Sequence, residues 1–311
     1  MKQIVYQWRP GAGSEVAALA RMRDTFPRPS SLMGEAWFMG EKRHMFTDLM
    51  GDLDTLPVNA LHKALEEIAS GTSSFGPREE WRDWFHYLLP HLVPRATERY
   101  VSALSETLVT AFMTQYPCGV VDPPYPQFRE DALNTLGRAM MNPACWHDGR
   151  IVNGTLLHRT KWPNGHWGWH DASGDLSASM FFNLKYLSPE EIPAWIASVL
   201  AIACPYWRAQ LLVWFVGAHD LLEGCIEDPS GLPHRGPKID WNWAHCLKMG
   251  NLAPGDPAPF FPRANCQTML EGLTKIMNED LLLQWLMTIA EVPELETELL
   301  ALPSRFEELY L

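Results

Sequence analysis

The feature that most constrains the fold of this chain is a four-residue spacing of apolar side chains, repeated in several segments. Within residues 94–116 the spacing is shared by Tyr100, Leu104, Leu108, Phe112 and Tyr116. An α-helix turns once in about 3.6 residues, so these side chains line one helical face. We predict an amphipathic helix beginning at Pro94, because a proline in the first turn loses no backbone hydrogen bond.

Prolines stand at the start of other stripes as well, at Pro57, Pro77, Pro293 and Pro303. A further helix start is predicted at Ser188–Glu191, where two acids suit the first turn. Apolar periodicity indicates additional helices at about 13–26, 127–141, 175–187, 206–223, 264–278 and 279–290. Short strands are conceivable only at residues 3–6 and 151–152. The sequence therefore predicts an all-α protein, either a multi-helix bundle or an irregular α-solenoid-like array.

Three stretches interrupt the helical pattern. Residues 118–126, CGVVDPPYP, are typical of an extended linker or hinge. Residues 143–174 are rich in Gly, Trp and His, and residues 228–263 are rich in Pro and Gly. We expect the last two to be long irregular loops, which often carry function. We expect residues 1–311 to form a single helical domain, or two lobes with a soft hinge near 118–126.

Charge and composition limit the classes of partner. The formal net charge of −12 disfavours nucleic acids and anionic membranes, and it suits either solubility or a basic partner. The most apolar region, 192–218, is interrupted by Pro193, Pro205 and Arg208, so we expect buried helices and no membrane span. The start of the chain has no signal-peptide pattern, and the six cysteines form no Cys-x-x-Cys pair. These features predict a cytoplasmic protein with reduced thiols.

Histidines and aspartates gather in the first irregular loop. That segment contains His158, His166, His170, Asp171 and Asp175. Imidazole and carboxylate groups are the ligands that zinc and iron sites use, but the segment lacks the glutamate of the His-Glu-x-x-His helix. The dipeptide His-Asp also occurs at 147–148 and 219–220. The competing interpretation is that these histidines are structural, and we predict no cofactor.

The chain has 14 tryptophans, and ten of them fall into two groups. Four have helical spacing among apolar neighbours and are predicted to be core: Trp195, Trp207, Trp214 and Trp285. Six lie in or beside the irregular stretches: Trp146, Trp162, Trp167, Trp169, Trp241 and Trp243. Paired indoles such as Trp-Gly-Trp and Trp-Asn-Trp could anchor a partner, or they could pin a long loop to the helices.

Two functional hypotheses remain open at the level of sequence. The first is a helical interaction module that binds a partner protein, such as a basic toxin that it neutralises. Its candidate binding residues are Trp162, His166, Trp167, Trp169, His170, Asp171, Trp241 and Trp243. The alternative is a metal-dependent hydrolase with a His/Asp site built from residues 147–175 and 219–220.

Overall fold

The computed structural model describes most of the chain. Its backbone is described for residues 5–33, 46–72, 78–96, 103–161, 163, 167–171, 173–232, 239, 241–252, 259–292 and 302–311. Side chains are described for the same residues except 157–161, 167–171 and 173.

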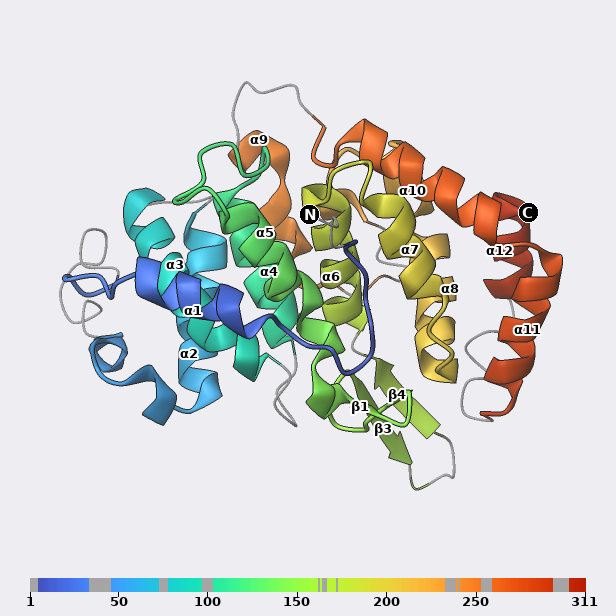
Figure 1. Cartoon of the computed structure of the whole chain (residues 1–311), viewed down its shortest axis with the longest axis horizontal. Helices are drawn as coiled ribbons and strands as arrows, with labels where there is room; N and C mark the ends of the chain where they lie inside the picture. The colour runs from blue at the N-terminus through green and yellow to red at the C-terminus, as the bar shows by residue number, and fades with distance from the viewer. Residues whose placement is uncertain are drawn as a thin grey trace.

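The described part of the chain is predominantly helical, which confirms the all-α prediction. The first helices are α1 Val16–Thr25, α2 Val58–Gly71, α3 Arg78–Leu92, α4 Leu104–Gln115 and α5 Phe128–Asn134. They are followed by α6 Ser173–Tyr186, α7 Ile192–Leu200, α8 Pro205–Leu222, α9 Met249–Leu252, α10 Arg263–Ile276, α11 Glu279–Ala290 and α12 Leu302–Tyr310. Helices α4 and α6 pack together at the centre, with α2 on the other side of α4, and α11 and α12 pack on α8 (Figure 1).

Two of the predicted prolines, Pro57 and Pro303, lie at helix starts. Pro57 is the N-cap of α2, and Pro303 is the second residue of α12. The expected apolar face of α2, made by Leu61, Leu65 and Ile68, is fully buried. Pro77 and Pro293 lie outside the described residues.

The segment 94–116 departs from its prediction in two ways. Pro94 belongs to a short 3₁₀ turn, Val93–Arg95, and α4 begins only after Ala103, whose φ of 60° is not helical. Tyr100 lies outside the described residues. Moreover, α4 is not amphipathic with one solvent face, because all 12 of its residues are buried. Its polar side chains face other protein groups rather than water, as the bonds described below show.

The first irregular stretch contains strands that were only partly anticipated. Two antiparallel hairpins occur there, β1 Trp146–His147 with β2 Arg150–Ile151, and β3 Leu157–Lys161 with β4 Trp167–Asp171. The suggested strand at 151–152 is thus confirmed at Ile151. At the other suggested position, residues 5–6 form no strand, and residues 3 and 4 lie outside the described residues. The strands β1, β3 and β4 lie together at one edge of the molecule (Figure 1).

Buried apolar side chains of the described residues join into one continuous core that extends from Tyr6 to Tyr310. The four tryptophans predicted to be core, at 195, 207, 214 and 285, are at most 1% exposed. Trp8 joins them at the N-terminal end: its ring makes edge contacts with Trp195 and Trp207 at centroid distances of 5.7 and 5.8 Å. The N-terminal segment is thereby held on the second half of the chain.

Candidate functional site

The predicted site residues of the first loop lie mainly on strand β4. Trp167, Trp169, His170 and Asp171 belong to this strand, whereas Trp162 and His166 lie outside the described residues. The register of the hairpin pairs His158 directly with His170, and Leu157 with Asp171. Directly paired residues of an antiparallel ladder have Cα atoms about 4.5–5.5 Å apart. The fold therefore brings two of the predicted histidine positions together across the hairpin.

A turn signal in the sequence could have revealed these hairpins. Asp148 and Gly149 have φ angles of 48° and 72°, the pair of positive values that a type I′ hairpin turn requires. Asp-Gly and Asn-Gly are the preferred dipeptides for this turn. The same signal, Asn164-Gly165, stands between β3 and β4. The period-2 apolar pattern that normally accompanies strands is weak here, and the strands were missed for that reason.

The two irregular stretches meet at the N-terminus of α4. Asp175, in the first turn of α6, accepts a hydrogen bond from the backbone N–H of Glu106 at 2.7 Å. The Glu106 carboxylate in turn accepts one from the backbone N–H of Trp243 at 3.0 Å. Burial raises the pKa of Asp175 to about 7, although the hydrogen bond from Glu106 opposes this rise. Asp175 therefore caps a helix end that is largely buried.

The Trp-Asn-Trp pair of the second loop contributes to the same junction. Trp241 is buried, its indole N–H donates to the Thr110 hydroxyl at 2.9 Å, and its ring stacks on Phe181 with centroids 5.4 Å apart. Trp243 is only half-buried and stacks on His245 at 5.7 Å. Trp241 therefore pins the loop to the helices, the second of the two roles that the sequence allows for the paired indoles. Trp243 keeps part of its surface accessible.

The other His-Asp dipeptides occupy unlike environments. His147 and Asp148 lie at the β1–β2 turn, where both side chains are more than four-fifths exposed and 3.4 Å apart. His219, on α8, contacts the hydroxyl of Tyr310 through its Nδ1 atom at 3.2 Å. Tyr310 donates to the carbonyl of Phe215 at 2.8 Å, so His219 belongs to the contact that holds α12 on α8. Among the side chains that the structure describes, no three His, Cys, Asp or Glu groups converge as metal ligands would.

An acidic groove that sequence analysis did not identify lies between α12 and the junction of α10 with α11. We define this groove by six of its lining residues, Thr274, Asn278, Glu279, Asp280, Glu308 and Tyr310, and its volume is about 790 Å³. Asn278 caps α11 by accepting the N–H of Leu281 at 2.8 Å, which fixes the orientation of the two acids that follow it. Arg305 pairs with Glu308 at 2.8 Å and offsets part of the negative charge.

An exposed apolar pair adjoins the acidic groove on α11. Leu283 and Met287 are 57% and 65% exposed, which is unusual for side chains of this size. Asp280, Leu283 and Met287 follow the spacing i, i+3, i+7, so they share one face of the helix. The periodicity of α11 was visible in the sequence, but which of its apolar residues would remain outside the core was not.

Comparison with known proteins adds no relative. No family model, no curated protein and no solved structure matches this chain. Among the helices of the described residues, none combines the length and apolar character that crossing a bilayer requires.

Proposed function

We propose that this chain is a protein-binding module whose partner presents a basic, amphipathic helix. The observation that carries the proposal is the face of α11 on which Asp280, Leu283 and Met287 lie in line beside the acidic groove. An exposed apolar pair with an acidic border is complementary to a helix with leucine-like residues on one face and lysine or arginine on the other. A basic toxin neutralised by the chain would be one partner of this kind.

The charge of the whole chain supports the same partner. With a net charge of −12, long-range attraction accelerates the approach of a basic protein. Local contacts at α11 would then determine the register, because Leu283 and Met287 are flexible apolar side chains that adapt to a partner surface. The first-turn acids Glu279 and Asp280 would pair with lysines at one end of the bound helix.

A synthetic peptide tests this proposal. The probe is a fluorescently labelled, 18-residue amphipathic helix made only of leucine and lysine, compared with its leucine and glutamate counterpart by anisotropy. We expect saturable binding of the lysine peptide alone. Each double variant, L283S/M287S or E279Q/D280N, removes two contacts of about 1 kcal/mol each and should therefore weaken binding about 30-fold. Raising the salt concentration should weaken it further.

Two matched variants serve as controls. V16S/V121S removes two other exposed apolar side chains, and D24N/D122N removes two other exposed charges. Both should bind the lysine peptide as the unmodified chain does. Equal binding of the two peptides, or equal weakening by the control variants, would show that the contact is non-specific and that the proposal is wrong.

The alternative, a metal-dependent hydrolase, is favoured by one specific observation, the direct pairing of His158 with His170 across β3 and β4. Two neighbouring histidines can supply half of a tetrahedral zinc site, and Asp171 is the next residue of the strand. If this alternative holds, calorimetric titration with Zn²⁺ should show one site per chain. H158A and H170A/D171A should abolish it with little change in melting temperature, whereas H147A, on the other hairpin, should retain it.

A further inference from the structure

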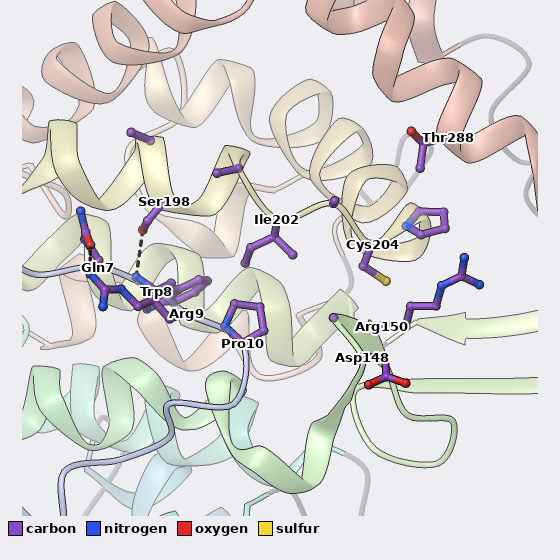
Figure 2. A pocket seen from close by; sticks show the side chains of 15 residues that line it. Gln7, Trp8, Arg9, Pro10, Asp148, Arg150, Ser198, Ile202, Cys204 and Thr288 are labelled. Carbon is purple, nitrogen blue, oxygen red and sulfur yellow. Dashed lines mark hydrogen bonds between the residues drawn. The ribbon is translucent and has the colours of Figure 1, made fainter.

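A second cavity opens between three segments of the chain. Its volume is about 750 Å³. Residues 7–10 form one wall, the β1–β2 turn at 148–150 forms another, and residues 197–205 at the junction of α7 and α8 form the third, with Thr288 of α11 at the rim (Figure 2). Cavities of roughly 300–1,000 Å³ are the size that small organic ligands occupy.

The N-terminal wall of the cavity is held rigidly. The backbone N–H of Trp8 donates to the Ser198 hydroxyl at 2.8 Å, and the Trp8 indole N–H donates to the carbonyl of Gly137 at 2.8 Å. Ser198 itself donates to the carbonyl of Trp195 at 2.6 Å. Because the two bonds made by Trp8 join residues more than 100 positions apart, the wall is preformed and a ligand need not order it.

The opposite wall is fixed by Trp146, the first residue of β1. Its indole N–H donates to the carbonyl of Met140 at 2.8 Å, and its ring meets Trp207 of α8 edge-on with centroids 5.6 Å apart. The short β1–β2 ladder pairs His147 with Arg150 and so places Arg150 at the rim. Figure 2 shows the Arg150 side chain extending along the rim on the side of Thr288.

The end of the cavity at Arg150 is cationic, in contrast to the acidic chain as a whole. Arg150 is exposed, and no ion pair or side-chain hydrogen bond joins it to another described residue. Thr288 accepts a hydrogen bond from Arg208 at 2.7 Å, which places a second guanidinium just behind the rim. Among the described residues that line the cavity, Asp148 is the one acidic side chain, and it contacts His147 at 3.4 Å. The lining contains two arginines, Arg9 and Arg150, so its formal charge is positive. An anion is therefore favoured at this end.

The remainder of the lining is mostly apolar. Trp8, Pro10 and Ile202 present carbon surface between the two walls (Figure 2), and Pro205 also lines the cavity. Helix α8 begins at Pro205 and has no acidic residue in its first turn, so the positive end of its dipole adds to the charge of Arg150. A cavity with an apolar lining and a few polar groups at one end orients a ligand that has both characters.

We propose that this cavity binds a small amphipathic organic anion. Its carboxylate, sulfonate or phosphate group lies at Arg150, beside the N-terminus of α8, and its apolar body lies against Trp8, Pro10 and Ile202. Arg150 is suited to this role because its planar guanidinium donates two parallel hydrogen bonds to such an oxyanion. This site is separate from the face of α11 that we assign to a protein partner, and either can exist without the other.

A pair of dyes that differ mainly in charge tests the proposal. The anionic probe is 8-anilinonaphthalene-1-sulfonate, and the neutral probe is N-phenyl-1-naphthylamine, which has the same apolar body without the sulfonate. Fluorescence titration should show one saturable site for the anionic dye. Because a charge-assisted hydrogen bond is lost, R150Q should weaken the anionic dye about tenfold or more and leave the neutral dye nearly unchanged.

Two further variants complete the experiment. A201W places an indole in the cavity from an exposed position at the end of α7, and it should reduce binding of both dyes. R305Q removes an exposed arginine on α12 and should change neither. Absence of saturable binding to the unmodified chain would overturn the proposal. So would anionic-dye binding that survives R150Q and A201W, or equal loss of both dyes in R150Q at an unchanged melting temperature.

Discussion

At the scale of single residues, this protein buries many polar groups, and several of them bond to other buried groups. His86 is a clear example: it is 6% exposed, contacts the Tyr116 hydroxyl at 2.6 Å and stacks on Phe26 at 4.5 Å. Burial lowers the pKa of His86 to about 3, so the ring stays neutral in the folded protein. Asp175 shows the same effect on an acid, because burial favours its protonated form.

The pKa of Asp175 yields a prediction about stability and pH. In the folded protein its pKa is about 7, above the ordinary value of 3.8, so between these values the folded state holds a proton that the unfolded state has released. The contribution of Asp175 to stability is therefore greatest below pH 4 and declines as the pH rises to 7. D175N keeps the acceptor for Glu106 but cannot ionise.

We accordingly expect D175N to unfold at about the same urea concentration as the unmodified chain at pH 4. At pH 8 it should be more stable, by an amount on the order of a few kcal/mol. The difference between the two proteins isolates Asp175 from all other titrating groups. A D175N variant that is destabilised equally at both pH values would contradict this interpretation of the site.

At the scale of elements, the buried helix α4 organises the centre of the molecule. Its polar side chains find partners in several directions: Thr107 contacts His62 at 2.9 Å, and Gln115 donates to the Thr72 hydroxyl at 2.6 Å. Trp241 joins the second irregular loop to the same helix through Thr110. The helical elements in the described part of this loop are short, at most four residues each, so the position of the loop depends on such anchors.

The anchoring role of Trp241 predicts a graded loss of stability. W241F keeps an aromatic ring against Phe181 but removes the hydrogen bond to Thr110, and it should cost about 1–2 kcal/mol. W241A also removes the ring and should cost about 3–5 kcal/mol. Chemical denaturation monitored by circular dichroism measures both. Near-equal stability of all three proteins would mean that this tryptophan is available for binding rather than required for packing.

Helix α8 leads to a second prediction at this scale. Leu211 is fully buried, and most of the helix is enclosed by neighbouring elements. L211D would place an unpaired charge in the core and should abolish soluble expression. V213D, at a half-buried position of the same helix, should be tolerated better. Normal yield and unchanged melting of L211D would show that this face of α8 is not enclosed.

At the scale of the whole molecule, the described cysteines bear on the redox state. Cys118 and Cys225 are exposed, the other four cysteines are buried, and the structure places none of the six in a disulfide. Burial raises the pKa of Cys246 and Cys266 to about 11, which keeps these thiols protonated and unreactive at neutral pH. The core is therefore held by packing and hydrogen bonds, without covalent crosslinks.

Titration with a thiol reagent tests this description. In denaturant without reductant, all six thiols should react, because no disulfide withholds any of them. In the folded protein, the exposed pair Cys118 and Cys225 should react first, since the thiolate is the reacting form and access to it is required. A count below six in denaturant would indicate a disulfide and would contradict the free thiols of this structure.

Sequence alone determined most helix positions, the burial of the four core tryptophans and the weakness of strand structure. These properties depend on neighbouring residues in the sequence. A four-residue spacing of apolar side chains places them on one face of a helix, and a proline in the first turn of a helix loses no backbone hydrogen bond. The loop predicted to carry function does contain the paired positions of His158 and His170. The Asp148-Gly149 turn signal is also local, and it is sufficient to indicate the first hairpin.

Only the tertiary structure decided which faces are solvent-exposed and which segments form a cavity. The polar face of α4 resembles a solvent face in sequence, but it is buried, and Asp175 and Trp243 bond to Glu106 in its first turn. Conversely, Leu283 and Met287 resemble core residues and remain exposed. The cavity beside Arg150 joins segments nearly 200 residues apart, and contacts over such separations depend on how helices pack rather than on local periodicity.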